Sequence, residues 1–206
     1  MNKSVFIKEY LDLILPDAKC ALNYTKDYEL VIAVMLSAQT TDKAVNNATI
    51  ELFNRYKTVE ELADANVFEV EKIIQKLGMF KVKAKNIIVI ANDLVNKFNG
   101  VVPKEKESLI TLPGVGVKTA NVVRAELFNI PEIAVDTHIL RISKRLGLSD
   151  LNSDPLKVEQ DLRRIFPEEQ YIKLHRQLIW FGRLICKAKN PNCEDCGLKS
   201  ICLKNP

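Results

Sequence analysis

The sequence predicts an all-α protein. Most of the chain consists of segments whose apolar residues recur at the spacing of an amphipathic helix. No segment shows the sustained alternation of apolar and polar residues that marks a half-buried strand. Several of the helical segments also begin or end at residues that commonly cap helices, such as Thr58, Gly78 and Gly100.

The helical pattern can be followed in order along the chain. The segment 28–39 is so apolar that we expect it to lie at the centre of the core. Thr58 predicts a capping-box start for a short helix that runs to Ala65, and Asp154-Pro155 predicts the start of another helix. Helices are expected over residues 4–15, 28–39, 43–56, 58–65, 67–77, 82–98, 118–128, 137–146, 155–166 and 170–185, with a further helix ending at 107–110.

The composition is that of an ordinary globular protein. The 206 residues are 47% hydrophobic and 27% charged, which suits one large domain or two small ones. No apolar run approaches the roughly 20 residues that span a bilayer, and the N-terminus reaches Glu9 before a signal-peptide core can form. The sequence therefore predicts a cytoplasmic protein without a membrane partner. The net charge of +4 is compatible with nucleic acid without proving it.

Residues 111–121 predict a tight turn between two helices, in the sequence Thr-Leu-Pro-Gly-Val-Gly-Val-Lys-Thr-Ala-Asn. Pro113 ends the first helix, while Gly114 and Gly116 can adopt backbone angles closed to other residues. The unpaired amides at the start of the second helix would make a seat for one phosphate, although a buried corner between helices needs glycine as well. Lys118 favours phosphate binding over a purely structural corner. A cation is unfavourable at a helix N-terminus, so a lysine at this position indicates a functional role more than a contribution to stability.

Four of the five cysteines lie within the last 21 residues. Because disulfides are rare in the cytosol, this clustered set indicates metal ligation. Four thiolates could bind one zinc ion, but zinc ribbons usually space their ligands as two separated Cys-x2-Cys pairs. The four are Cys186, Cys193, Cys196 and Cys202, separated by six, two and five residues. The fifth, Cys20, is expected to be a buried apolar residue.

Other polar residues allow both a structural and a functional interpretation. Asp136 precedes a helical pattern, where an aspartate is commonly the N-cap. Gln39 lies in a run of small and polar residues that ends an apolar helix, and such a run is usually a cap or a turn. Two basic clusters would ordinarily be solvated faces. They are Lys81, Lys83 and Lys85, and Arg141, Lys144 and Arg145.

Three of these stretches together resemble the endonuclease III family of DNA base-excision glycosylases. They are Leu112 to Asn121, Leu36 to Asp42 and the four-cysteine run, and the likeness extends over nearly the whole chain. The resemblance implies a two-lobed helix-hairpin-helix glycosylase fold with DNA held in the cleft between the lobes. It divides the chain into a helical bundle over 20–130, with the hairpin at about 107–128, and a second lobe formed by 1–19 and 131–206.

The resemblance also implies a reaction. The family motif places a catalytic lysine at Lys118 and a catalytic aspartate at Asp136. Lysine is a nucleophile only as the free amine, and a carboxylate can accept its proton or stabilise the cationic sugar. The chain is thus expected to be a bifunctional glycosylase and abasic-site lyase that removes oxidised pyrimidines and cleaves the strand by β-elimination through a Schiff base. The alternatives are a related glycosylase for mismatches or other lesions and a non-catalytic DNA-binding module.

Further residues receive roles from the same likeness. Gln39 would fill the gap left by a nucleotide that is flipped out of the duplex. Met79 or Phe80 would insert as an apolar wedge, although the family more often has leucine at position 79. Asp42 would line the pocket, and capping of the next helix explains it equally well. The remaining DNA contacts are expected at Leu112, Gly114, Val115, Gly116, Thr119, Lys187 and Lys189, and the remaining pocket positions at Ser37 and His138.

For the cysteine run, the resemblance implies a [4Fe–4S] cluster held by the four thiolates in a loop over 186–202. The expected role of the cluster is structural, since folding the loop around it would fix nearby lysines for phosphate contacts. The implied partner is double-stranded DNA with a damaged base or an abasic site. We expect a monomer that is associated with the nucleoid through this DNA.

Overall fold

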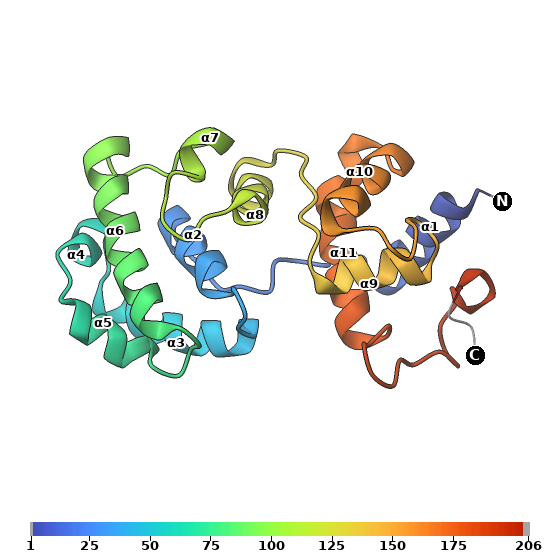
Figure 1. Ribbon diagram of the computed structural model, residues 1–206, viewed down its shortest axis with the longest axis horizontal. Coiled ribbons are helices and arrows are strands. Elements are labelled where there is room, and N and C mark those ends of the chain that lie inside the picture. The colour runs from blue at the N-terminus through green and yellow to red at the C-terminus, as the bar shows by residue number, and fades with distance from the viewer. Residues whose placement is uncertain (1, 204–206) are drawn as a thin grey trace. The chain divides into compact units, whose positions relative to one another are not determined.

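The computed structural model describes residues 2–203, and these fold into helices and turns without a strand (Figure 1). The predicted all-α class is confirmed. None of the helices in this range has both the length and the apolar character needed to cross a bilayer. The α-helices are α1 (Lys3–Ile14), α2 (Asp27–Leu36), α3 (Asp42–Arg55), α4 (Val59–Ala63), α5 (Val67–Ile74), α6 (Phe80–Phe98), α7 (Lys106–Leu109), α8 (Val117–Phe128), α9 (Thr137–Arg145), α10 (Pro155–Ile165) and α11 (Tyr171–Leu184), with 3-10 turns at Glu168–Gln170 and Lys199–Ile201.

The chain divides into two compact units. The central unit is Cys20–Phe128, and the terminal unit combines Met1–Lys19 with Asn129–Pro206. Each unit has its own hydrophobic core, so its amphipathic helices are buried against partners of the same unit. Residues 1 and 204–206, which the sequence assigned to the second lobe, lie outside the described residues.

The centre of the central unit is α2. Every residue from Tyr28 to Leu36 is buried, as predicted for a helix that is apolar on all sides. Helices α3, α6 and α8 pack around it, and α6 also contacts α4 and α5 (Figure 1). The long helix α6 therefore connects the short helices of this unit to its core.

Several helix ends differ from the prediction, and α2 ends at Leu36 instead of residue 39. Helix α5 ends at Ile74 instead of Leu77, because the amide of Leu77 bonds to the carbonyl of Ile74 at 2.9 Å in a tighter turn. The left-handed residue after this helix is Met79, with a φ of 59°, and not the expected Gly78. Helix α7 is a single turn before the hairpin, because the amides of Thr111 and Leu112 bond back three residues, at 3.2 and 3.1 Å, in tighter turns.

In the terminal unit, α11 packs against both α1 and α9. Gly182 permits the close approach of α9, because a Cβ at this position would lie 2.9 Å from the Cβ of His138. Asp12 of α1 accepts hydrogen bonds from Lys173 and Gln177 of α11, at 2.6 and 2.9 Å. The N-terminal helix is thus fixed to the last helix by polar contacts as well as by the apolar core.

Candidate active site

The predicted hairpin joins α7 to α8 through a turn that contains Gly114. The amide of Val115 donates to the carbonyl of Leu112 at 3.1 Å, which closes the turn. Gly114 has a φ of 76°, in the left-handed region. A Cβ there would lie 2.8 Å from Nδ2 of Asn86 and 3.0 Å from Cγ of Met35. Glycine is therefore required at this position for both its conformation and its size.

Gly116 has a different environment. Apart from its chain neighbours, no protein atom comes within 4 Å of the place its Cβ would occupy, so the glycine leaves the start of α8 open. The amides of Val117, Lys118 and Thr119 find no acceptor among residues 2–203, because the first turn of a helix has no intrahelical partners for them. Unpaired amides with an open approach can bind one phosphate.

Lys118 is the second residue of α8, and its side chain is exposed. In the part of the chain that the structure describes, no hydrogen bond or ion pair engages this side chain. A primary amine in this position is available to a nucleic acid bound at the hairpin. The predicted contacts Leu112 and Val115 have buried side chains, so these two positions can offer DNA only their backbone groups.

The turn between α2 and α3 exposes Gln39. Its φ of 55° lies in the left-handed region, which residues other than glycine seldom adopt. Ser37 starts the turn, and its hydroxyl donates back to a carbonyl of α2 at 2.8 Å. The N-cap of α3 is Thr41, whose Oγ1 accepts an amide of the first turn at 3.3 Å. The capping role considered for Asp42 is therefore wrong, because Asp42 is already the first residue inside α3.

The turn before α6 exposes Met79. This residue is the N-cap of α6 in left-handed conformation, and its side chain is 62% exposed. Phe80 packs instead against the core of the central unit. Exposure therefore favours Met79 over Phe80 as the residue that can reach a bound duplex, a choice that the sequence left open.

Sequence reasoning missed Lys83, which it grouped with Lys81 and Lys85 in a solvated cluster. Lys83 is only 5% exposed, and its Nζ donates to the carbonyls of Leu36 and Ala38, both at 2.9 Å. Burial lowers the pKa of this ammonium group. The helical period could have indicated this burial. Lys81 and Lys85 are four residues apart and share one face of the helix, whereas Lys83 lies on the opposite face.

In the terminal unit, Asp136 is the N-cap of α9. Its Oδ1 accepts the amide of Ile139 at 2.8 Å, which confirms the structural interpretation of this residue. The bond fixes the direction of the carboxylate, and no hydrogen bond from another described residue engages Oδ2. A carboxylate held in this way can cap the helix and still accept a proton.

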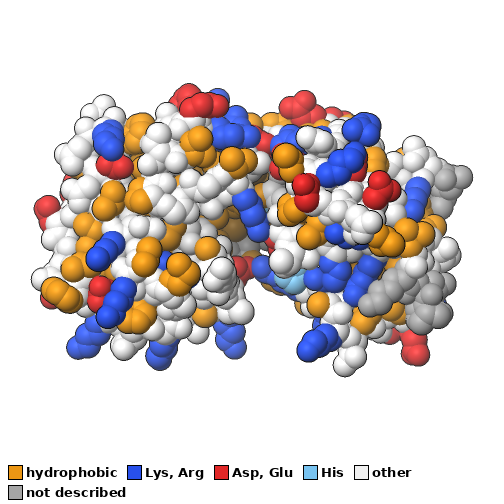
Figure 2. Space-filling view, in the orientation of Figure 1, with side chains coloured by type: hydrophobic (Ala, Val, Ile, Leu, Met, Phe, Trp, Pro, Cys, Tyr) orange, Lys and Arg blue, Asp and Glu red, His pale blue; other side chains and the backbone are white. Residues whose placement is uncertain are grey.

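The basic side chains of α9 bind the chain that follows α11. Arg141 donates to the carbonyl of Cys186 through Nε at 3.1 Å and Nη2 at 2.9 Å, and Nη2 also lies 3.2 Å from Nδ1 of half-buried His138. Arg145 donates to the Sγ of Cys186 at 3.3 Å and to the carbonyl of Lys187 at 2.8 Å. Figure 2 shows basic side chains gathered over this part of the unit. The cluster is therefore partly structural, since it holds the start of the cysteine loop.

The four predicted cysteine ligands line one cavity of about 30 Å³. All four are half-buried free thiols. Burial raises the pKa of the Cys196 thiol, and the other three thiols raise it further. No three His, Cys, Asp or Glu side chains within residues 2–203 converge closely enough to hold a single ion. Leu198 of this loop is fully buried and Gly197 packs against the ring of Tyr10, so the loop is anchored to the core of the unit.

Comparison with a family model defines the class of protein. Residues 32–168 match the HhH-GPD superfamily of base excision DNA repair proteins. The matched range includes the hairpin, Gln39, Met79 and Asp136, and ends before the cysteine loop. A thermostable thymine-DNA glycosylase has the same fold, with a TM-score of 0.86 at 22% identity over 99% of this chain and 96% of that one. The fold and the hairpin thus define a helix-hairpin-helix base-excision protein.

Individual relatives narrow the assignment. Endonuclease III of Bacillus subtilis (strain 168) is 43% identical over 189 residues, or 92% of this chain and 86% of that protein. Endonuclease III of Rickettsia felis is 46% identical over 91% of this chain and 87% of its own length. A trapped endonuclease III–DNA covalent intermediate superposes with a TM-score of 0.93 at 40% identity, covering 100% of this chain and 97% of that one. The chain belongs to the endonuclease III family, and as a member it is a base-excision DNA glycosylase and abasic-site lyase.

Proposed function

We propose that this chain removes oxidised pyrimidines from duplex DNA and cleaves the resulting abasic site through a Schiff base on Lys118. The observation that carries the proposal is the exposed Lys118 side chain, which no described residue engages, beside three unpaired amides of α8. The amides suit the phosphate of a bound strand and the amine suits its sugar. The 40% identity to a chain that was trapped in a covalent complex with DNA supports the same chemistry.

The reaction follows from an amine and a carboxylate acting on one extruded nucleotide. The amine of Lys118 attacks C1′ of the sugar as the bond from C1′ to the base breaks, and the departing base takes up a proton from the solvent. Asp136 accepts the proton that the amine loses. The sugar ring then opens to an imine between C1′ and the lysine. The imine acidifies the 2′ proton, and its removal expels the 3′ phosphate by β-elimination, which cuts the strand.

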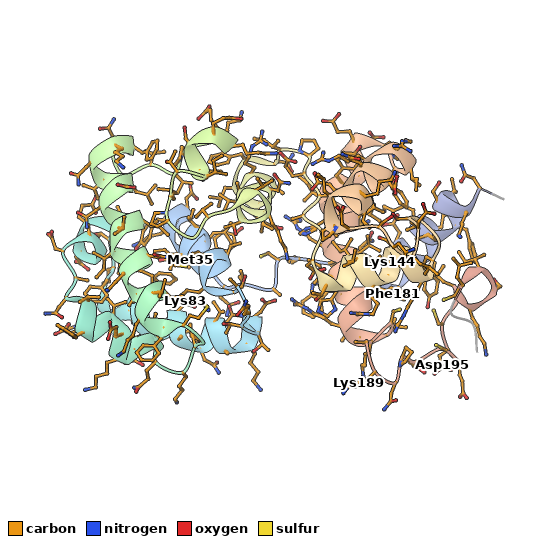
Figure 3. All side chains as sticks on the ribbon, viewed as in Figure 1. Met35, Lys83, Lys144, Phe181, Lys189 and Asp195 are labelled. Carbon is orange, nitrogen blue, oxygen red and sulfur yellow. The ribbon has the colours of Figure 1, made fainter. Side chains whose placement is uncertain are left out.

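Extrusion of a nucleotide requires groups that replace it in the stack. Gln39 and Met79 are exposed on two turns of the central unit and are proposed to enter the duplex, with Phe80 supporting Met79 from the core. Lys187 and Lys189 are exposed at the start of the cysteine loop, where they suit phosphates; Figure 3 labels Lys189. The partner is double-stranded DNA, bound by a single chain. In the central unit, Ser37 and Asp42 are assigned to the pocket for the extruded base.

The four cysteines are assigned to a [4Fe–4S] cluster. Zinc ribbons usually space their ligands as two separated Cys-x2-Cys pairs, whereas these four are separated by six, two and five residues and line one cavity. This arrangement fits a cluster whose irons each take one thiolate. Arg145 donates to the Sγ of Cys186 at 3.3 Å and holds this sulfur at the edge of the cavity. When bound, the cluster supplies a cross-link that holds the loop and its lysines in place.

Iron content tests the cluster. The purified chain should contain about four irons. Cys193→Ser should lose most of this iron, whereas the control Cys20→Ser changes a cysteine of the central unit and should keep it. One zinc per chain in place of iron, or full iron content in Cys193→Ser, would contradict the assignment.

The substrate is tested by comparing excision from three duplexes, which contain thymine glycol, a G·T mismatch or an A·8-oxoguanine pair. We expect thymine glycol to be excised fastest, by about a hundredfold or more, because a pocket that binds one base by hydrogen bonds rejects the others. The strand should also be cut on the 3′ side of the lesion. Preference for either mismatch would assign the chain to another lesion class, and binding without excision of any of them would leave only a DNA-binding module.

A further inference from the structure

Lys83 is a buried cation whose side-chain hydrogen bonds all lead to one turn. Besides the carbonyls of Leu36 and Ala38, its Nζ donates to Oγ1 of Thr40 at 2.8 Å. These three acceptors span the segment that carries Gln39 between them. Figure 3 labels Lys83 on α6, with Met35 near the end of α2. All three donors of one ammonium group are therefore committed to the turn after α2.

The backbone of the same residue is bonded to the second exposed turn. The amide of Lys83 donates to the carbonyl of Met79 at 3.0 Å, in the first turn of α6. Met79 and Gln39 both have left-handed backbones, with φ of 59° and 55°. Such conformations are unfavourable for residues with side chains and persist only where the surroundings impose them. This amide bond is the first i to i−4 bond of α6 and does not depend on the side chain. The lysine therefore links the two turns by reaching from the first turn of α6 to the turn that carries Gln39.

A buried ammonium group is itself unfavourable unless acceptors replace its water. Two of the acceptors here are carbonyls at or just beyond the end of α2, where the helix dipole favours a positive charge. An apolar side chain would fill the same space without the cost of burying a charge, but it could not hold the turn. The arrangement therefore fixes a backbone geometry in addition to filling the core.

We propose that Lys83 is a positioning residue for base extrusion, which holds the Gln39 turn in the geometry that fills the vacated place in the duplex and ties it to the Met79 turn. The inference rests on the proposed function, because it assumes that Gln39 and Met79 enter the stack. Lys83 does not touch the reacting sugar in this account. It acts by keeping two turns ordered before DNA binds, so that their ordering does not have to accompany extrusion.

The test separates extrusion from chemistry by comparing two abasic substrates. An abasic site in duplex DNA has to be extruded and its gap filled, whereas a single-stranded abasic site needs only the reaction at Lys118. Lys83→Met keeps an unbranched side chain that is one atom shorter and removes the charge. Lys83→Arg keeps the charge, and Thr40→Val removes one acceptor with little change of shape. Val70→Ala, a fully buried position on α5, controls for loss of core stability.

We expect single-turnover cleavage of the duplex substrate to fall about tenfold or more in Lys83→Met, with cleavage of the single strand within about threefold of wild type. Lys83→Arg should recover most of the duplex rate, and Thr40→Val should show a smaller loss in the same direction. A 2-aminopurine opposite an uncleavable abasic analogue should brighten less with Lys83→Met than with Val70→Ala. Thr40→Val and Lys83→Arg carry the test if Lys83→Met does not fold.

Two outcomes overturn the inference. In the first, Lys83→Met and Thr40→Val cleave both substrates at the same rates as Val70→Ala, when the variants are compared at equal loss of melting temperature. In the second, Lys83→Met lowers the cleavage rate of both substrates by the same factor, which is the behaviour of a purely structural residue. A wild type that cleaves neither substrate overturns the proposed function itself, and the inference falls with it.

Discussion

Gly114 and Gly116 lie two residues apart in the hairpin and are glycines for different reasons. Gly114 has a left-handed backbone and is enclosed by Asn86 and Met35, so a side chain is excluded by conformation and by space. Gly116 has an ordinary φ and open space around it. The absence of a side chain at Gly116 leaves room for a ligand to approach the amides of α8, and in this account that ligand is a phosphate of DNA.

This difference predicts opposite results for two alanine substitutions. Gly114→Ala should lower the free energy of unfolding by about 1–3 kcal/mol, the usual cost of a strained backbone position. Gly116→Ala should change it by less than about 0.5 kcal/mol while weakening binding to an abasic duplex. Urea unfolding and a DNA-binding titration of both variants provide the measurements. Wild-type stability in Gly114→Ala, or wild-type affinity in Gly116→Ala, would contradict the assignment of the respective glycine.

Asp136 can be divided into its two roles by a pair of substitutions. Asparagine caps a helix about as well as aspartate, whereas alanine loses about 1 kcal/mol of helix capping. Asp136→Asn should therefore keep wild-type stability, and Asp136→Ala should not. Both should lose about 10²- to 10⁴-fold in excision rate, the range for a lost acid–base group. An Asp136→Asn variant with the wild-type rate would show that the carboxylate serves only as a cap.

At the scale of the helix, the sequence predicted which segments are helical better than where they end. Periodic apolar residues specify a buried face over several turns, so each of the long helices was found. Helix ends depend on only one or two local hydrogen bonds, so the sequence predicted them less accurately. Thr41 and not Asp42 caps α3, and the left-handed residue before α6 is Met79 and not Gly78. In both places two adjacent residues were suitable, for the cap in the first case and for the left-handed conformation in the second.

The site residues differ in how far the sequence could predict them. Lys118 and Gly114 belong to a local pattern, so the hairpin was visible in ten consecutive residues. Lys83 contacts Leu36 and Thr40 from more than forty positions away, and no local pattern specifies such partners. The one local indication was the helical period. Lys81 and Lys85 share one face of the helix, so Lys83 between them lies on the opposite face, which points inward.

The contact between α1 and α11 has a defined dependence on pH. Burial tends to raise the pKa of Asp12, but hydrogen bonds from Lys173, Lys8 and Gln177 outweigh it and lower the pKa from 3.8 to about 2. Because the folded pKa is the lower one, the carboxylate stabilises the fold above pH 3.8, and this contribution is lost as the pH falls towards 2.

The corresponding prediction concerns Asp12→Asn. The side chain is 39% exposed and therefore screened by water, so the variant should lose no more than about 1 kcal/mol near neutral pH. The difference from wild type should shrink as the pH is lowered through the range between 3.8 and about 2. Urea unfolding of both proteins across this range measures it. A difference that stays constant or grows at low pH would show that the pKa of Asp12 is not lowered by these contacts.

At the scale of the whole molecule, two separate cores were not readable from composition. The chain has no long linker, and an amphipathic face specifies that a helix is buried without naming its partner. The terminal unit joins α1 to helices more than a hundred residues later. Leu198 and Gly197 then fix the cysteine loop to the same unit through the core and Tyr10. Such long-range pairings come from the tertiary structure and not from any local pattern.

The central claim is that Lys118 forms a covalent imine with DNA. Borohydride reduction of the protein on a duplex with a single abasic site tests it most directly, with the cross-linked peptide identified by proteolysis and mass spectrometry. The account predicts a cross-link at Lys118 in the wild type, none in Lys118→Ala, and slower formation in Asp136→Asn. A wild-type protein with its iron intact that gives no cross-link, or a cross-link at another lysine that persists in Lys118→Ala, would contradict it.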